Sequence, residues 1–317
     1  MTTTCFKPIR EHRTTATARL WRRVVALWLA LSLSVLAACI RQAPLPTDAG
    51  LRLVSTAPHL TECLCAIGAA HLLVGRTATC DYPPETVREI PVVGDFGTPW
   101  LEPVLSVRPT HVLETVLSDP ALRDRLTALH IPVVHVPCTR LDQIPGTLRQ
   151  LGALCGCSAR ADRLAGDIQR GLEQSRQAAL SRRIRPRVLL LFAPDTPITA
   201  GRNAFVAALL EHAGGINIGH AIDADYSRVS LEWIISQDPD LLLCIFETSS
   251  RPVDVYAEQT GWRSLRAVRA DRVYTVTDLN TVSRPGPRVL DGIAQVKAIL
   301  DQDADRSMTQ TPTVKHP

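Results

Sequence analysis

Short apolar runs alternate with helix-period stripes along most of this chain. Six runs have the length of strands buried on both faces of a parallel sheet: residues 51–57, 72–77, 131–136, 187–192, 241–245 and 272–277. Apolar residues three and four positions apart predict helices at residues 61–67, 121–129, 204–212 and 289–300, with another around Leu265. Strands and helices in alternation are typical of a doubly wound α/β fold.

One helical pattern is much longer than the others. Residues 158–180 carry an apolar stripe near the 3.6-residue period, and Ser158 is a suitable N-cap. A helix of this length spans roughly 35 Å, enough to cross two lobes. We therefore expect two Rossmann-like lobes, residues 52–157 and 187–300, joined by one long α-helix within residues 158–186. A single rigid connection predicts little opening between the lobes, and the polar residues 301–317 predict a disordered tail.

A thirteen-residue pattern occurs twice, 130 positions apart. LEPVLSVRPTHVL begins at Leu101 and LEWIISQDPDLLL begins at Leu231, and their leucines, glutamates, serines and prolines align. Each copy predicts a short helix with an exposed acid in its first turn, Glu102 or Glu232, then a proline that ends the helix and an apolar strand. We expect Thr98-Pro99 to cap the first helix and Ser230 the second. The repeat indicates two similar lobes with corresponding glutamates.

The amino terminus has the pattern of an export signal. Residues 1–23 hold six basic residues and one acid, and an apolar run follows from Val24 to Ala38. Fifteen residues is the length of a signal-peptide core and is short for a membrane span. The run ends in Leu36-Ala37-Ala38-Cys39, which resembles a bacterial lipobox. We therefore expect a lipoprotein signal peptide at residues 1–38, lipidation of Cys39, and a tether at residues 39–51.

Charge and cysteine content add little further chemistry. The net charge of +4 is concentrated at the amino terminus: residues 1–39 hold six of the 35 basic residues and one of the 31 acidic ones, which leaves 29 and 30, a net charge near −1. The mature chain thus gives no electrostatic indication of nucleic-acid binding. Seven cysteines remain after Cys39, and their spacings match no common zinc or redox motif. We expect most of them to be small buried residues, and we predict no metal site.

Aromatic and cationic residues occur in the loops that follow the predicted strands. Ligands of doubly wound folds bind at the carboxyl ends of the strands, so these loops should form the wall of a cleft between the lobes. The candidate wall residues are Phe96, Trp100, Tyr226, Phe246 and Arg284. Phe96 and Tyr226 each stand six residues before a repeat glutamate.

Several motifs together carry a family resemblance. They are RLVSTAP at Arg52, CDYPPE at Cys80, VGDFG at Val93, the two Leu-Glu units, GGIN at Gly214, and RPGPR at Arg284. In this order and spacing, the chain from about Arg52 to Leu300 resembles the substrate-binding lipoproteins of iron-complex and cobalamin ABC importers. The resemblance implies a helical-backbone periplasmic binding protein fold, a shallow cleft for a large flat metal complex, and docking of Glu102 and Glu232 onto arginines of the permease.

The resemblance also implies a set of ligand contacts. In the vitamin B12-binding members, aromatic residues at the positions of Phe96 and Tyr226 face the corrin, and Thr79 and Ile198 occupy two further contact positions. Asp278 or Asn280 occupies an acidic one. The cysteine pair that bridges the second lobe in the enterobacterial protein falls near Ala213 and Lys297, so that disulfide is missing here. With Trp100, Arg228 and Arg284 from the cleft loops, these residues are the predicted ligand set.

These expectations amount to an exported, lipid-anchored and monomeric receptor, in the periplasm or on the outer face of the cytoplasmic membrane. It would have no cofactor of its own and would deliver a cobalamin-like corrinoid or a ferric complex to an ABC permease. A ferric siderophore, with Arg228, Arg251 and Arg284 as donors, and haem, with Tyr226 or Tyr82 as axial ligand, are alternatives. A binding or sensor scaffold without transport is another. An enzyme is not indicated, because the chain has no GxSxG elbow or Walker loop, and GGxxxG at Gly214 is not a dinucleotide fingerprint.

Overall fold

The computed structural model describes residues 50–309 apart from residues 117–118, 194–195 and 249–250. The predicted signal peptide, the predicted lipidation site Cys39 and most of the predicted tether lie outside the described residues, as do residues 310–317 of the predicted tail. The described residues belong to one compact unit. Within the described residues, no helix combines the length and apolar character that crossing a membrane requires.

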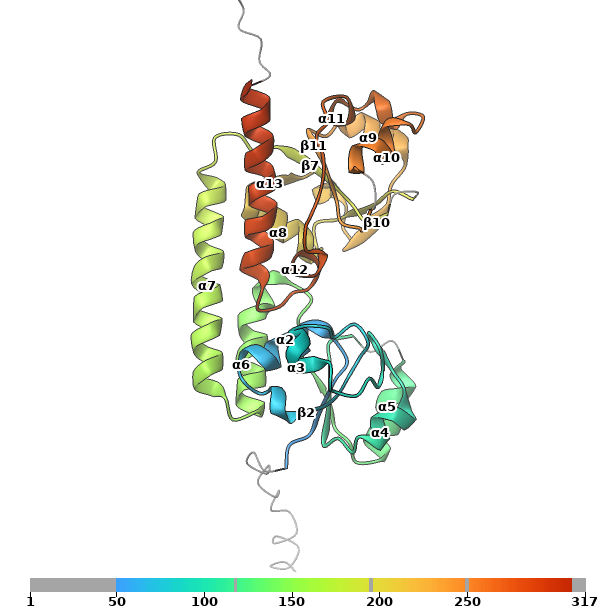
Figure 1. Cartoon of the computed structure of the whole chain (residues 1–317), viewed down its shortest axis with the longest axis vertical. Coiled ribbons are helices and arrows are strands. Elements are labelled where there is room, and N and C mark those ends of the chain that lie inside the picture. The colour runs from blue at the N-terminus through green and yellow to red at the C-terminus, as the bar shows by residue number, and fades with distance from the viewer. Residues whose placement is uncertain (1–49, 117–118, 194–195, 249–250, 310–317) are drawn as a thin grey trace, which may run out of the picture. The chain divides into compact units, whose positions relative to one another are not determined.

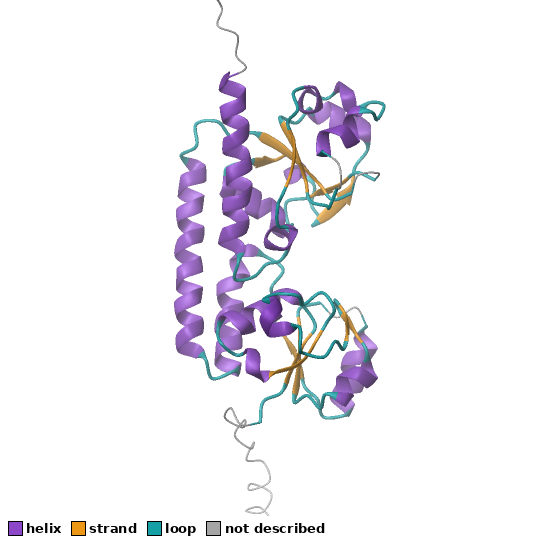
Figure 2. Ribbon diagram, in the orientation of Figure 1, coloured by secondary structure: helices purple, strands orange, loops and turns teal. Residues whose placement is uncertain are grey.

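The first lobe is built on a parallel sheet of four short strands with the order β2-β1-β5-β6 (Figure 2). The strands are β1 (Leu53–Ser55), β2 (Leu73–Arg76), β5 (His111–Glu114) and β6 (Val133–His135), and a small antiparallel pair, β3 (Gly94–Asp95) and β4 (Thr98–Pro99), lies between β2 and β5 in the chain. The helices are α2 (Pro58–Ala66), η1 (Ala70–Leu72), α3 (Pro84–Val87), α4 (Leu101–Ser106), α5 (Pro120–Ala128), η2 (Leu141–Gln143) and α6 (Ile144–Leu154).

The second lobe follows the long helix α7 (Ser158–Leu180) and has the same plan. Its parallel sheet comprises β7 (Arg187–Leu191), β9 (Ile216–Asn217), β11 (Leu241–Cys244) and β12 (Val273–Thr275), and its antiparallel pair is β8 (Ile198–Ala200) with β10 (Tyr226–Arg228). The helices are α8 (Phe205–Ala213), η3 (Ile218–Ala221), α9 (Leu231–Gln237), α10 (Pro252–Ala257), η4 (Trp262–Ser264), α11 (Arg266–Arg269), α12 (Leu279–Ser283) and α13 (Val289–Thr309).

Sheet topology confirms that the two lobes are similar. Listed from the other edge, the second sheet has the order β9-β7-β11-β12, so in both lobes the first strand lies between the second and the third, and the fourth is at the edge. In each lobe the second strand of the antiparallel pair, β4 or β10, comes directly before the helix that carries the repeat glutamate. The predicted fold class, an α/β fold with two lobes joined by a long helix, is confirmed.

The long helix packs against both lobes instead of crossing free solvent. Helix α7 contacts α6 of the first lobe and α8 and α13 of the second (Figure 1). Its buried stripe includes Ile168 and Leu172, each of which contributes roughly 1.5 to 3 kcal/mol by burial. Gly171 lets α13 approach closely, because a Cβ there would stand 2.5 Å from Leu290 Cδ1. One apolar cluster runs through these helices from Leu53 in the first sheet to Leu300 in α13.

The repeat forms the predicted helices, although only one of them has the predicted cap. Ser230 caps α9, and its Oγ accepts a hydrogen bond from the backbone N–H of Trp233 at 3.1 Å. Thr98-Pro99 was wrongly predicted to cap α4: these two residues form β4, and Trp100 occupies the cap position without a side-chain hydrogen bond. The equivalent residues Arg108 and Asp238 both have positive φ, 46° and 38°. Both stand directly before the repeat prolines, which disfavour a helical conformation at the preceding residue.

Other predicted boundaries need correction. The first helix begins at Pro58 and not at residue 61, because Pro58 occupies the first helical position, where its missing N–H costs nothing. Ser158 is the first residue of α7, and Cys157 occupies the cap position. The predicted tail is also wrong over residues 301–309, which continue α13. A buried ion pair holds this extension, since the carboxylate of Asp303 accepts hydrogen bonds from Arg272 and Tyr274.

Candidate functional site

A cavity of about 450 Å³ lies between the two lobes. The first lobe contributes His59, Thr79, Phe96, Thr115 and Cys138, among others, and the second contributes Asn203, Asp225, Tyr226, Asn280 and Arg284. Thr115 directly follows β5, and the other loops that reach the cavity include those after β2, β6 and β12. The cavity is therefore at the carboxyl ends of the parallel strands, where doubly wound folds place their ligands.

Two aromatic side chains project into this cavity from the antiparallel pairs. Phe96 stands in the turn between β3 and β4 and is 48% exposed, and Tyr226 begins β10 and is 50% exposed. The Tyr226 ring packs edge-on against Phe192, with the ring centroids 5.0 Å apart. Half-exposed aromatic rings on both lobes provide flat apolar surface for a ligand.

The structure brings four of the eight predicted ligand residues to the cavity. Phe96, Tyr226, Thr79 and Arg284 line it, whereas Trp100, Ile198, Arg228 and Asp278 do not. Trp100 is exposed at the start of α4, and Ile198 pairs with Arg228 across the β8 and β10 ladder. Asp278 caps α12, where its Oδ1 accepts a hydrogen bond from the backbone N–H of Asn280. Among the further wall candidates, Phe246 lines a neighbouring cavity of about 520 Å³ that also includes Asn280.

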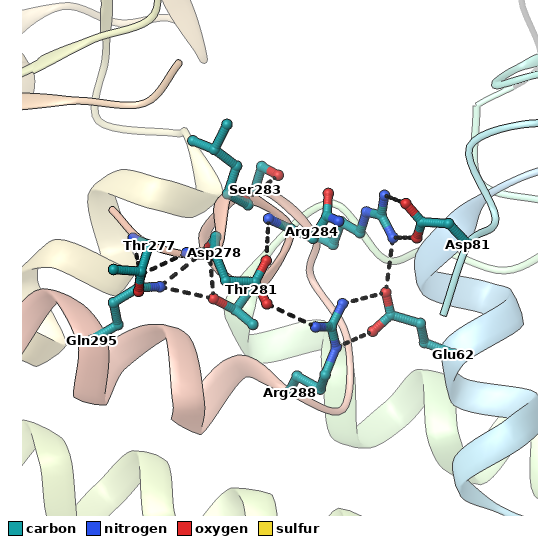
Figure 3. Close-up of polar contacts among 11 residues, drawn as sticks. Glu62, Asp81, Thr277, Asp278, Thr281, Ser283, Arg284, Arg288 and Gln295 are labelled. Carbon is teal, nitrogen blue, oxygen red and sulfur yellow. Dashed lines mark hydrogen bonds and ion pairs between the residues drawn. The ribbon is translucent and has the colours of Figure 1, made fainter. Parts of the chain in front are cut away.

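Ion pairs join the two lobes beside the cavity. Glu62, on α2, accepts hydrogen bonds from Arg284 at 3.2 Å and from Arg288 at 2.8 and 2.9 Å (Figure 3). Arg284 also donates to both carboxylate oxygens of Asp81, at 2.5 and 3.2 Å, and Arg288 donates to Asp278 at 3.1 Å. The side chains of Glu62, Arg284 and Arg288 are only 2%, 12% and 15% exposed. The buried carboxylate of Glu62 and the more exposed carboxylates of Asp81 and Asp278 thus balance the charges of the two arginines at the contact between the lobes.

The segment between these two arginines lies directly on the first lobe. The guanidinium of Arg288 stacks over the Tyr82 ring, 3.9 Å from its centroid. The thiol of Cys138 donates a hydrogen bond to the Pro285 carbonyl at 2.9 Å. A Cβ at Gly286 would stand 3.6 Å from the Cβ of His59, so this loop approaches α2 closely. The RPGPR segment is therefore a contact surface between lobes as well as part of the cavity wall.

Asp81 stays ionised at neutral pH. Its hydrogen bond with Arg284 holds the pKa of this carboxyl below its usual value, against the opposing effect of partial burial. Asp81 thus presents a charged carboxylate to Arg284. The strength of such pairs follows from the charge on both groups and from their bidentate geometry.

His59 is a buried, neutral imidazole in the cavity wall. Its Nε2 lies 2.9 Å from Thr115 Oγ1, and the Thr115 hydroxyl donates its own hydrogen to the Val136 carbonyl at 2.9 Å. His59 must therefore donate from Nε2, which leaves the lone pair on Nδ1. Burial, and then the nearby charge of Arg284, lower the pKa of His59 to about 4.

The titration of His59 predicts a pH dependence of stability. Unfolded histidine takes up a proton near pH 6.5, whereas folded His59 does so only near pH 4, so the unfolded state binds more protons between these values. The free energy of unfolding should therefore fall by up to about 3 kcal/mol as the pH drops from 6.5 to 4. Urea unfolding of the His59→Gln variant should show most of this slope removed. The control, His71→Gln at an exposed histidine, should retain it; equal slopes in the wild type and in His59→Gln would contradict the assignment.

The sequence patterns did not reveal the inter-lobe network. They gave no indication that Glu62, Asp81 and Arg288 meet or that His59 lines the cavity. One signal was present: Glu62 is the one acid in the helix that holds Leu60, Cys63 and Leu64, and a buried carboxylate requires a partner. The partner itself is 222 residues away and could not be identified from the sequence.

The repeat glutamates and the cysteines occupy different environments. Glu102 and Glu232 are exposed in the first turns of α4 and α9 and do not line the cavity. Five of the seven cysteine side chains in the described part of the chain are buried, as expected: Cys63, Cys80, Cys138, Cys155 and Cys244. The described residues contain no group of three or more His, Cys, Asp or Glu side chains arranged to hold a metal ion.

Comparison with known proteins places this fold and cavity in a family. The model of the periplasmic binding protein family matches residues 53–278, which is more than half of the chain. The chain belongs to the periplasmic binding protein family. As a periplasmic binding protein, it is a solute-binding component of ABC importers and not an enzyme, and it has no cofactor of its own.

Individual members support this periplasmic binding protein assignment. The vitamin B12-binding protein of Pectobacterium carotovorum is 28% identical over 247 residues, covering 77% of this chain and 86% of the relative. The uncharacterised ABC transporter substrate-binding lipoprotein YvrC of Bacillus subtilis is 27% identical over 264 residues, covering 80% of each. Among solved structures, the apo form of the periplasmic haem-binding protein RhuT from Roseiflexus sp. RS-1 superposes with a TM-score of 0.72 at 25% identity, covering 81% of this chain and 100% of the other.

Proposed function

We propose that this periplasmic binding protein is a lipid-anchored receptor that delivers a cobalamin-like corrinoid or a ferric complex to an ABC permease. One observation carries the proposal: Phe96 and Tyr226, each six residues before a repeat glutamate, line one cavity from different lobes. Half-exposed aromatic side chains from both lobes are suited to a large flat ligand. Relatives named for vitamin B12 and for haem binding support the same class of cargo.

A binding screen tests the proposal directly. The chain from residue 40 onward, which lacks Cys39 and therefore the lipid, would be titrated with cyanocobalamin, cobinamide, haem and ferric siderophores, and binding would be followed by calorimetry. We expect saturable one-to-one binding of at least one of these complexes. Haem and ferric siderophores remain the alternative cargoes within the same function, whereas the absence of binding to all of them would contradict a receptor for metal complexes.

The aromatic pair gives a prediction for any flat ligand that the screen identifies. Replacing Phe96 and Tyr226 together by alanine should weaken binding by about 1 to 3 kcal/mol, since the ligand loses aromatic burial and stacking on both sides. Calorimetry of the variant and the wild type measures the difference. Trp100→Ala is the matched control. Trp100 directly follows β4, close in the chain to Phe96, and is 52% exposed, but it does not line the cavity. An unchanged affinity of the double variant would remove the pair from the site.

Membrane attachment of the receptor rests on the amino-terminal sequence. We propose that cleavage before Cys39 leaves this residue as the diacylated first residue of the mature chain, followed by a short tether. Mass spectrometry of the mature amino terminus checks this, and an unmodified cysteine or a different cleavage point would overturn it.

Permease docking is the proposed role of the repeat glutamates. Glu102 and Glu232 are exposed, one on each lobe, and neither is part of the cavity. The backbone N–H of Glu232 and the Ser230 hydroxyl hold the pKa of the Glu232 carboxyl below its usual value, so it is charged at neutral pH. A fixed negative charge on each lobe is suited to arginines of a permease.

A further inference from the structure

We propose that the cavity selects neutral or cationic metal complexes and discriminates against complexes that carry free carboxylate or catecholate charges. The reason lies in Arg284, whose charge the protein already neutralises with Asp81 and Glu62. This inference rests on the proposed function, because it specifies which members of the cargo class the receptor takes.

Arg284 is already engaged by two carboxylates of the protein. It is the one Arg or Lys among the described residues that line the cavity. Its Nη1 donates to Asp81 Oδ1 at 2.5 Å and to Glu62 Oε1 at 3.2 Å, and its Nη2 donates to Asp81 Oδ2 at 3.2 Å. A ligand carboxylate that approached this guanidinium would therefore meet two carboxylates that already offset its charge.

The charges around Arg284 sum to a negative value. The connected cluster contains the arginines 284 and 288 and the carboxylates of Glu62, Asp81 and Asp278, which gives a net charge of −1. Asp225, also in the cavity lining, adds a further negative charge. His59 adds none at neutral pH, since its pKa is about 4. An anion in the cavity is therefore repelled, and a cation is attracted.

The other candidate cations do not reverse this balance. Arg251 is held by Asp271 at 2.7 Å. Arg228 shares a face of β10 with Tyr226, because side chains two residues apart in a strand point the same way. Arg228 does not line the cavity, however, whereas the acid Asp225 does. The six residues in the three internal gaps of the described chain include no Lys or Arg.

The remaining polar groups of the lining are uncharged. They include Thr79, Thr115, Thr139, Asn203, Asn280 and Ser283. Hydroxyl and amide groups can both donate and accept hydrogen bonds, so they complement the primary amides of a corrinoid or the hydroxamates of a neutral or cationic ferric chelate. They provide no counter-charge for propionates, citrate or catecholates.

Matched ligand pairs of nearly equal shape test the inference. The pairs are cyanocobalamin with its monocarboxylate, in which one side-chain amide is hydrolysed; haem dimethyl ester with haem; and ferrioxamine B with its succinylated form. In whichever pair binds, we expect the less negative member to bind about tenfold more tightly at low ionic strength. The difference in affinity within a pair should shrink as salt screens the charges in and beside the cavity.

Asp81→Asn tests whether the carboxylate paired with Arg284 causes the preference. This variant keeps the shape of the side chain but removes its charge, which leaves the charge of Arg284 less fully offset. The preference for the less negative member should therefore fall at least threefold or reverse. Asp81 is 53% exposed, which favours retention of the fold, and urea unfolding of the ligand-free variant checks this. Asp271→Asn is the control, because it also removes the charge of a carboxylate that pairs with an arginine, Arg251. Asp271 precedes β12 and is therefore at the opposite end of this strand from the cavity.

The outcomes separate this inference from the function on which it rests. A preference for the less negative ligand that weakens in Asp81→Asn but not in Asp271→Asn supports it. Equal or tighter binding of the anionic member, or a preference that both variants leave unchanged, overturns the inference while the receptor function stands. Binding of no complex from any pair overturns the receptor function, and the inference with it.

Discussion

Replacing Glu62 by alanine should lower the free energy of unfolding by about 3 kcal/mol, because it leaves two largely buried arginines without their shared partner. Arg284 and Arg288 would keep Asp81 and Asp278, which are 53% and 45% exposed, and these more hydrated carboxylates cannot replace a partner that is 2% exposed. Urea unfolding at pH 7 measures the change. Because Glu62 joins the lobes, loss of this side chain weakens the contact that fixes the cavity.

Two further variants isolate the buried charge. Glu62→Gln keeps the volume and one hydrogen-bond acceptor, so it separates loss of charge from loss of packing and should cost less than the alanine. Glu89→Ala removes an acid whose ion pair with Arg88 is solvent-exposed and should change stability by less than about 1 kcal/mol. If Glu62→Ala were as mild as Glu89→Ala, the inter-lobe pairs would contribute nothing net.

Charge reversal at both repeat glutamates, Glu102→Arg with Glu232→Arg, should abolish transport and leave ligand affinity within a few fold. Both carboxylates are exposed and neither lines the cavity, so they can act only through a partner outside this chain. Repulsion between the new arginines and arginines of the permease would prevent docking. Uptake by cells that carry the variant, together with calorimetry of the purified variant, measures the two quantities separately.

A control with the same change of charge distinguishes docking from general electrostatics. Glu89→Arg with Glu258→Arg also reverses one exposed acid on each lobe, away from the repeat, and should leave transport near the wild-type rate. A collapse of ligand affinity in the repeat variant would instead place the glutamates in the binding site or in the fold. Normal uptake by the repeat variant would contradict the docking role.

Local patterns predicted the elements of this fold well. The strands, the long helix α7 and the duplicated unit follow from the spacing of apolar residues, since each element must bury one face or stripe wherever it lies. The cap at Ser230 was predicted for the same reason: a cap contacts only the next few residues. Helix α6 was missed although Ile144, Leu148 and Leu151 form a buried stripe at helical spacing. The two antiparallel pairs were missed because strands of two or three residues are too short to show a period.

Distant contacts also explain where the structure departs from the local patterns. Helix α13 continues past Leu300 because Asp303 pairs with Arg272, which directly precedes β12 and lies 31 residues earlier. Four of the eight predicted ligand residues do not line the cavity, because the sequence indicates which loops reach the cleft but not the direction of each side chain. Asp278 shows the difficulty: the sequence places it after a strand end, and the structure uses its carboxylate to cap α12 and to bind Arg288.

The sequence by itself determined the α/β class, the duplication into two lobes and the exposed glutamate on each, because these follow from periodicity and spacing within short segments. Only the tertiary structure decided that Phe96 and Tyr226 line one cavity and that Arg284 is already paired with Glu62 and Asp81. Those contacts join residues up to 222 positions apart, and they exist only once both sheets have packed against the same layer of helices. The charge that a ligand meets is therefore a property of the folded protein and not of any segment of the chain.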